Sequence, residues 1–144
     1  MTTENDELRL DEYYQHIEDA GKLLTSQHAR RWSSAALKTL GISLDRGTKR
    51  ELAKALPEEL ANDLTGVFWL AHFRDPDQPL QDFLQRVARR AGNTDHQFAR
   101  LPTSAVFGGI NAMIDRQIRE RVARSLAPEV SEFWQQAAEE KVLG

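Results

Sequence analysis

The chain has 144 residues, 40% of them hydrophobic and 28% charged, with a formal net charge of −3. This composition is typical of a globular protein rather than of a disordered or a membrane protein. The absence of cysteine excludes disulfides and thiolate metal sites and fits a cytoplasmic location. The N-terminus lacks the basic and apolar regions of a secretory signal. The longest apolar run, 67–71, is far shorter than the ~20 residues that span a bilayer. We therefore expect a cytoplasmic protein with no membrane partner.

In the first half of the chain, apolar residues recur with helical spacing, and no segment alternates like a β-strand. The predicted helices are 10–22, 26–40, 46–55 and 58–71. Ser26 is the expected N-cap of the second helix, and Ser43 or Asp45 that of the third. Gly41 is expected to end the second helix, and Pro57 suits the first turn of the fourth.

The segment 72–79 contains two prolines and is the expected linker between the halves. The predicted helices after it are 80–91, 95–110, 116–125 and 128–138. Asn93, Thr94 or Asp95 is expected to cap a short turn at the start of the segment 95–110. Pro102 and Thr103 are expected to open the main helical part, which runs to about Ile114. Residues 1–9 are expected to be a flexible N-terminus and 139–144 a C-terminal tail.

The two halves resemble each other when residues 10–64 are placed on residues 80–134. Identical pairs include Gln27/Gln97, Ala29/Ala99, Arg30/Arg100, Ser34/Ser104, Asp45/Asp115, Arg46/Arg116 and Glu59/Glu129. Self-similarity at a fixed offset is typical of a tandem repeat. Four short helices bury little apolar area on their own. The sequence therefore predicts an all-α fold in which two four-helix repeats, 10–71 and 80–138, pack as one compact domain about a pseudo-two-fold axis.

The apolar stripes of these helices define the expected core. The core residues predicted from them are Trp32, Leu37, Leu40, Leu52, Leu56, Leu60, Leu64, Phe83, Val87, Phe107, Ile110, Val122 and Leu126.

Three motifs carry a resemblance to a known family. They are the segment DFLQRVARRAG at 82–92 and the Leu-x-x-Glu-[Leu/Val] turns at Leu56–Leu60 and Leu126–Val130. Together with the duplication, they resemble the bacterial domain-of-unknown-function family numbered 2267, over about 8–135. The family's Leu-Pro-x-Glu-Leu is intact in the first turn, whereas in the second the proline is shifted by one position. The resemblance implies an all-helical repeat and supplies no catalytic residue.

No motif in the chain names a reaction. The four histidines have no zinc-binding spacing, and no serine lies in a nucleophile elbow. His72 with Asp75 and Asp77 supplies too few ligands for calcium. Gly108-Gly109 lies in an apolar helical stretch without the lysine of a phosphate loop, so close helix packing is the better interpretation. We expect no catalytic residue, no cofactor and no metal, with an enzyme of unrecognised site as a remaining alternative.

The charges alternate in blocks along the chain. Residues 27–56 carry 7 basic and 2 acidic groups, and residues 86–124 carry 8 and 3, so each of these blocks is +5. The flanking blocks 1–25, 57–82 and 128–144 are acidic. The repeated pair Asp-Arg, at 45–46 and 115–116, indicates either two symmetric binding sites or, as we favour, an N-cap with an arginine salt bridge in each half.

Three interpretations of the charge blocks compete. The blocks can be solvated faces, a surface for an acidic protein or a second copy of the chain, or a nucleic-acid surface. Nucleic acid is less favoured because only Phe98 and Asn111 lie near the arginines as base readers, and the acidic blocks oppose phosphate. We expect a non-enzymatic helical interaction module that can self-associate. Trp69 and Trp134 are candidate apolar anchors, with core packing as the alternative for both, slightly favoured for Trp134 because it aligns with Leu64. The candidate interaction surface is Arg46, Lys49, Arg50, Trp69, Arg86, Arg89, Arg90, Arg116, Arg119, Arg124 and Trp134.

Overall fold

The computed structural model describes residues 4–66, 75–92 and 95–139, which form eight α-helices and no β-strand. The helices are α1 (Glu4–Ala20), α2 (Ser26–Ser43), α3 (Arg46–Ala55), α4 (Glu58–Leu64), α5 (Leu80–Arg90), α6 (His96–Met113), α7 (Arg116–Ser125) and α8 (Pro128–Glu139). The predicted all-helical class is confirmed for these residues.

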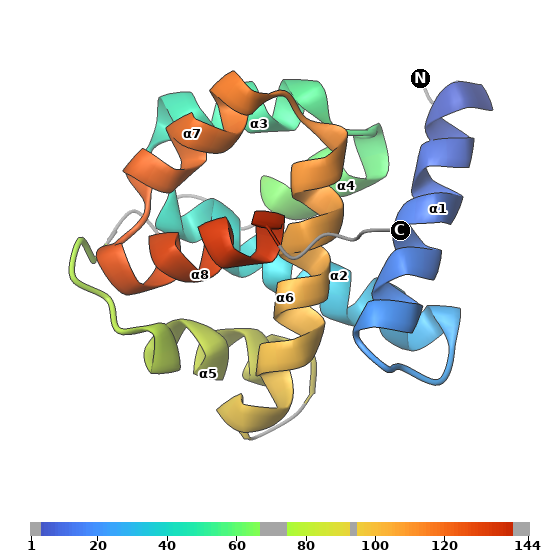
Figure 1. Ribbon diagram of the computed structural model, residues 1–144, viewed down its shortest axis with the longest axis horizontal. Coiled ribbons are helices and arrows are strands. Elements are labelled where there is room, and N and C mark those ends of the chain that lie inside the picture. Colours follow the sequence, from blue (N-terminus) through green and yellow to red (C-terminus); the bar gives the residue numbers. More distant parts are fainter. Residues whose placement is uncertain (1–3, 67–74, 93–94, 140–144) are drawn as a thin grey trace.

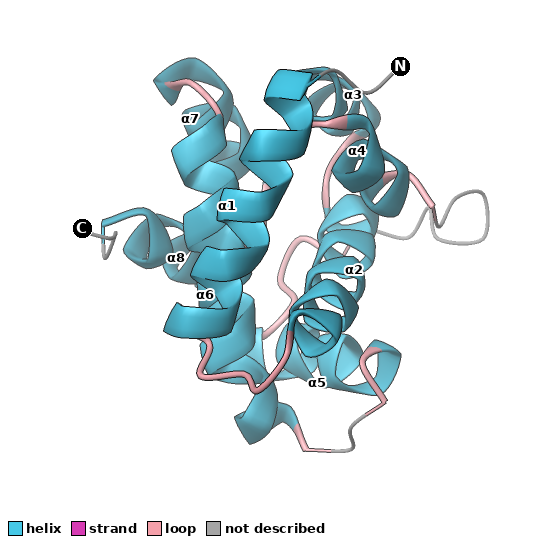
Figure 2. Cartoon of the chain, turned by 90° about the vertical axis from the view of Figure 1, so that its right-hand side faces the viewer, coloured by secondary structure: helices cyan, strands magenta, loops and turns pink. Residues whose placement is uncertain are grey.

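Helix α6 has a central position in the molecule. It packs against α1 on one side and α8 on the other, and it also contacts α2 and α5 (Figure 1). Helices α3 and α7 lie side by side at one end of the molecule, and α5 lies at the opposite end (Figure 1). Seen from the side in Figure 2, α1 runs along the outside of the molecule, where it contacts both α6 and α2.

The core is one cluster of buried apolar residues drawn from both halves of the chain. All thirteen residues predicted for it are buried, so the apolar stripes were assigned correctly. At its centre the Phe107 ring lies 5.8 Å from that of Phe83, 5.7 Å from that of Phe133 and 5.1 Å from that of Trp134. Tilted and edge-on aromatic contacts of this kind add stability beyond the buried area alone.

Gly41 does not end α2, as the sequence had suggested, because the helix continues to Ser43. Its role is a close approach between helices, since a Cβ at this position would overlap the Leu64 carbonyl oxygen of α4. Glycine is therefore required at position 41 by helix packing and not by a change of backbone conformation.

The ends of several helices differ from the predicted ones. Thr25, rather than Ser26, caps α2 by accepting a bond from the His28 amide. Pro102 lies inside α6, which starts at His96 as a single helix. α4 ends at Leu64, and the rest of the predicted helix beyond residue 66 lies outside the described residues, as do residues 72–74 of the predicted linker.

The segment 4–9, expected to be flexible, is the first part of α1. Hydrogen bonds of Arg9 hold this segment against the rest of the molecule. Its guanidinium donates to the carbonyl oxygens of Ala55 and Met113 over 3.4 and 3.3 Å. One side chain thus ties the start of α1 to the C-terminal ends of α3 and α6, where helix carbonyls lack partners of their own.

Candidate functional site

The basic helices α3 and α7 are brought together by the fold. Ser125 Oγ, at the end of α7, donates to Asp45 Oδ2 and accepts from the Asp45 amide, each over 2.9 Å. The Arg121 side chain of α7 reaches α3 at Gly47, where a Cβ would lie 2.9 Å from its Nη2 atom. The two helices together carry eight basic residues: Arg46, Lys49, Arg50, Lys54, Arg116, Arg119, Arg121 and Arg124. We call these residues, except Arg119, the paired basic surface.

The two Asp-Arg pairs begin α3 and α7. Asp45 Oδ1 accepts from the Thr48 amide over 2.8 Å, and Asp115 Oδ1 accepts from the Ile118 amide over 2.9 Å. Both aspartates are therefore N-caps, as the structural interpretation required. Arg116 forms a 3.2 Å ion pair with Glu120 one turn later, on an exposed face where such pairs add little stability.

The members of the paired basic surface differ in exposure. Arg46, Arg50, Arg116 and Arg124 are exposed. Lys49 is half-buried, and its pKa is lowered mainly by burial and further by the neighbouring charge of Arg46.

Arg119, in contrast, is part of the framework. It donates to the carbonyl oxygens of Asn111 and Ile114 over 3.1 and 2.9 Å, and so satisfies the C-terminal end of α6. Its guanidinium is half-buried in these contacts rather than presented to solvent. Its assignment to the interaction surface is therefore corrected.

Arg86, Arg89 and Arg90 do not join the paired basic surface. They lie on α5, at the other end of the molecule (Figure 1). Arg90 Nη1 donates to Thr39 Oγ1 of α2 over 3.5 Å, and its pKa is lowered by burial first and by Arg86 second. The basic residues predicted as one candidate surface therefore form two separate groups.

Of the two candidate tryptophan anchors, Trp134 is buried. Trp134 is 1% exposed, packs edge-on against Phe107 and donates from Nε1 to the Arg119 carbonyl oxygen over 3.2 Å. It is a core residue, and its assignment to the interaction surface is wrong. Trp69 lies outside the described residues. The exposed large apolar side chains among the described residues are Leu8, Leu24, Phe98 and Leu101.

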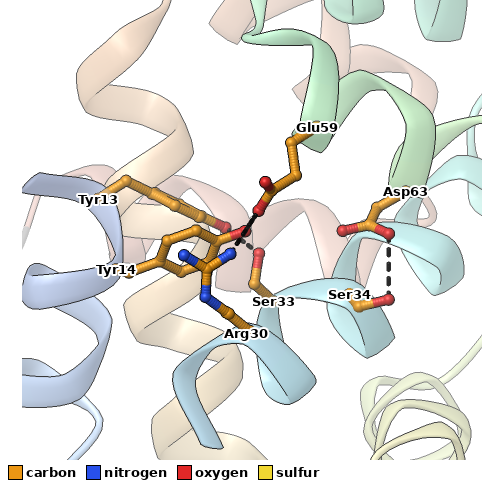
Figure 3. A network of polar contacts seen from close by, with 7 residues as sticks. All are labelled: Tyr13, Tyr14, Arg30, Ser33, Ser34, Glu59 and Asp63. Atoms are coloured by element: carbon orange, nitrogen blue, oxygen red, sulfur yellow. Dashed lines mark hydrogen bonds and ion pairs between the residues drawn. The ribbon is translucent and has the colours of Figure 1, made fainter. Parts of the chain in front are cut away.

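A polar network that the sequence analysis did not single out joins α1, α2 and α4 (Figure 3). The Tyr14 hydroxyl donates to Glu59 Oε2, which also accepts from Arg30 over 2.9 Å, and the Arg30 guanidinium lies 4.4 Å above the Tyr14 ring. Behind this group, the hydroxyls of Tyr13 and Ser33 share a 2.6 Å hydrogen bond. The network ends at Ser34, which donates to Asp63 over 3.2 Å.

The hydrogen bonds and the ion pair of this network hold α1, α2 and α4 together. Burial raises the pKa of the Tyr13 and Tyr14 hydroxyls above their ordinary range, so both stay protonated at neutral pH. The pKa of the Asp63 carboxyl is also raised, mainly by burial. In the second half of the chain, Phe83, Leu84 and Phe133 lie at the positions aligned with Tyr13, Tyr14 and Asp63. This polar-to-apolar difference between aligned positions was the signal in the sequence that could have pointed to the network.

A hollow of about 480 Å³ lies between α1 and the C-terminal half of α6. It is lined by Arg9, Glu12, Tyr13, His16, Gly108, Gly109, Ala112 and Met113. Gly109 has little room for a side chain, since a Cβ would lie 2.8 Å from the Tyr13 ring. Gly109 thus allows the close packing of α1 on α6. His16 Nε2 is buried there without a hydrogen-bond partner among the described residues.

The remaining candidate chemistry lies in the segment before α5. Asp75 Oδ1 accepts from the Asp77 amide over 2.9 Å in an exposed turn, and His72 lies outside the described residues. Among the residues that the structure describes, no three His, Asp or Glu side chains are placed to hold a metal ion. In the same residues, no helix has the length and apolar character needed to cross a bilayer.

The fold defines an all-helical protein with basic helices from its two halves in contact. Residues 10–135 match the family described as "Uncharacterized conserved protein (DUF2267)". Because this match covers most of the chain, the protein belongs to that family, and the resemblance seen in the sequence is confirmed. No curated protein and no solved structure gives a significant match.

Proposed function

We propose that the protein is a non-enzymatic, cytoplasmic interaction module that binds an acidic protein segment through the paired basic surface. The observation that carries the proposal is the packing of α3 on α7, secured by Ser125 and Asp45. Basic helices that are 70 residues apart in the sequence thereby lie side by side and bring their positive charges together. Such a cluster steers and orients an acidic partner.

The crowding of like charges also supports an anionic partner. The pKa of Lys49 is lowered by its burial and by Arg46, which means that the positive charge is held there at some cost. An acidic segment lying across α3 and α7 would offset this repulsion. If these basic residues were only solvated, the packing of one basic helix against another would bring repulsion without any benefit.

A protein partner is favoured over nucleic acid by the residues between the arginines. α3 and α7 contain no aromatic side chain that could stack on a base. Asn111, considered as a base reader in the sequence, is 3% exposed and donates to the Phe107 carbonyl oxygen within its own helix. The alternative partner is a nucleic acid. The same surface could contact its phosphates but offers no side chain that reads bases.

The test compares a fluorescent oligoglutamate peptide with a DNA duplex of similar charge by fluorescence anisotropy. We expect peptide binding that weakens with salt. The double variant Arg116→Glu/Arg124→Glu should weaken it by about tenfold or more. The matched control, Arg86→Glu/Arg89→Glu on α5, should leave it unchanged. Equal losses in both variants would contradict the proposal, and tighter binding of DNA than of the peptide would favour the alternative.

We also propose that the two halves are structural copies related by a pseudo-two-fold axis. Equivalent helix pairs are in contact: α1–α2 and α5–α6, α2–α4 and α6–α8, α3–α4 and α7–α8, and α1–α6 and α5–α2. An experimental structure tests this by superposition of 10–64 on 80–134. Equivalent helices that run in different directions after superposition would exclude a common repeat.

A further inference from the structure

In the first half of the chain, helix α2 binds two carboxylates that α4 supplies. Arg30 Nη1 donates to Glu59 Oε2 over 2.9 Å. One turn later on the same face of α2, Ser34 Oγ donates to Asp63 Oδ1 over 3.2 Å. The Arg30 guanidinium also lies over an aromatic ring, 4.4 Å from the ring centre of Tyr14. An arginine over a ring and a serine one turn away thus form a carboxylate-binding pair (Figure 3).

The second half of the chain keeps this pair on α6 but does not keep its carboxylates. The arginine and the serine of α2 align with Arg100 and Ser104 of α6, and α6 packs against α8 as α2 packs against α4. One aligned carboxylate, that of Glu129, instead accepts from the Leu80 amide at the start of α5 over 2.8 Å. The other is replaced by Phe133. The helix that should supply the carboxylates therefore supplies none to this pair.

Arg100 and Ser104 are consequently without an internal partner. Neither side chain makes an ion pair or a hydrogen bond with the residues that the structure describes. The Arg100 guanidinium lies over the Phe133 ring, 5.4 Å from its centre. A guanidinium held by the face of a ring keeps the N–H donors at its edge available.

A hollow of about 320 Å³ lies beside these two side chains, between α6 and α8. The residues that line it are Gln97, Arg100, Leu101, Ser104, Phe133 and Gln136. Four of them carry hydrogen-bond donors and two are apolar, and Leu101 is 47% exposed. A few polar groups beside an apolar wall, in a volume of this order, are typical of a site for a small molecule.

We propose that this hollow binds a small organic carboxylate. The carboxylate accepts from Arg100 and Ser104, as the α4 carboxylates accept from the aligned residues of α2, and the apolar part of the ligand lies against Leu101 and Phe133. A small molecule is the occupant because the hollow is closed by α8 on one side and offers apolar as well as polar contacts. The site lies on α6 and α8, so it is separate from the paired basic surface on α3 and α7.

Phenylacetate is the probe, titrated to about 20 mM into the ¹⁵N-labelled full chain at constant ionic strength and followed by NMR. We expect saturable shifts of amide signals from α6 and α8 around the hollow. Phenylacetamide has the same shape without the charge and should bind at least about tenfold more weakly. Inorganic phosphate should also bind more weakly, because it has no apolar part to bury against Leu101 and Phe133.

Two variants test the role of the arginine from opposite directions. Arg100→Gln removes the cation, and Gln136→Glu supplies an internal carboxylate beside it, so each should weaken phenylacetate binding by about tenfold or more. Ser104→Ala should weaken it by about threefold. Arg86→Gln is the matched control, because Arg86 is an exposed arginine of α5 that does not line the hollow. Circular dichroism establishes that each variant is folded.

The absence of saturable shifts, shifts confined to α3 and α7, or equal affinity for phenylacetamide or phosphate would overturn the proposal. An equal loss in Arg86→Gln would do the same. Oligoglutamate binding should be unchanged in Arg100→Gln, which separates this site from the paired basic surface. A loss of oligoglutamate binding in that variant would assign the hollow to the acidic protein partner and overturn its assignment to a small ligand.

Discussion

Ser125 and Asp45 are joined by two hydrogen bonds of 2.9 Å, although they are 80 positions apart in the chain. Ser125 closes α7 and Asp45 caps α3, so this one contact fixes the relative positions of the two basic helices. No matching contact can join Asp115 to the end of α3, because Ala55 lies at the position aligned with Ser125. The hydrogen bonds between Asp45 and the end of α7 therefore depend on one serine.

Ser125→Ala should destabilise the protein by roughly 0.5–1.5 kcal/mol, because it removes a largely buried hydroxyl that both donates and accepts. Urea unfolding gives the free energy of unfolding. Thr65→Ala is the control, since that exposed hydroxyl, directly after α4, donates to the Ala61 carbonyl oxygen one turn earlier and makes no contact with the other half of the chain among the described residues. Similar losses in both variants would show that the joint contributes no stability of its own.

Leu56→Ala and Leu126→Ala should each cost roughly 2–5 kcal/mol. Both leucines are 7% exposed and directly follow α3 and α7, at aligned positions in the two halves. The loss comes from the removed apolar contacts and from the cavity left behind. Denaturant midpoints measure it, and a change below about 0.5 kcal/mol would contradict the burial of these side chains.

Gly41→Ala should destabilise the protein by about 1–3 kcal/mol or more, because the new methyl group meets the backbone of α4 at Leu64, which has no rotamer to change. Gly108→Ala is the matched comparison on α6. There the Cβ would meet only ordinary contacts, 3.4 Å from the Ala137 carbonyl oxygen and 3.5 Å from His16 Nε2. Alanine's better helix propensity should make that variant neutral or slightly stabilising. Thermal unfolding should therefore rank Gly41→Ala far below Gly108→Ala.

Asp63→Asn should raise the stability at pH 7. The pKa of Asp63 is raised in the folded protein, mainly by burial, so its ionised form is disfavoured there relative to the unfolded chain. The favourable effect of the protonated carboxyl is present below the unfolded pKa of about 4 and is lost as the pH rises through the higher folded value.

Asparagine retains an oxygen that accepts the hydrogen bond from Ser34. Because asparagine does not ionise, the variant no longer loses stability as the pH rises. The variant should therefore show a higher denaturant midpoint at pH 7 and a flatter pH dependence above about pH 4. Asp11→Asn, on the exposed face of α1, is the control. A lower midpoint for Asp63→Asn at pH 7 would mean that attraction to Lys38 outweighs the cost of burial.

The sequence by itself determined the helices and the core. Helical periodicity is a local property, so the apolar stripes identified Leu37, Leu52 and Phe107 as buried without knowledge of their neighbours. The caps Asp45 and Asp115 were equally readable, because a cap bonds within its own first turn.

Only the tertiary structure decided which helices contact each other and which polar residues lie together on the surface. Gly41 was predicted to end a helix, but its position is set by the contact with α4. The sequence allowed Trp134 to be either an anchor or a core residue, and its packing on Phe107 makes it a core residue. Segments distant in the chain meet in the paired basic surface, in the hollow between α1 and α6, and in the network of Tyr14 with Glu59. Such contacts depend on side-chain shape and charge across helix interfaces, which the local spacing of apolar residues does not encode.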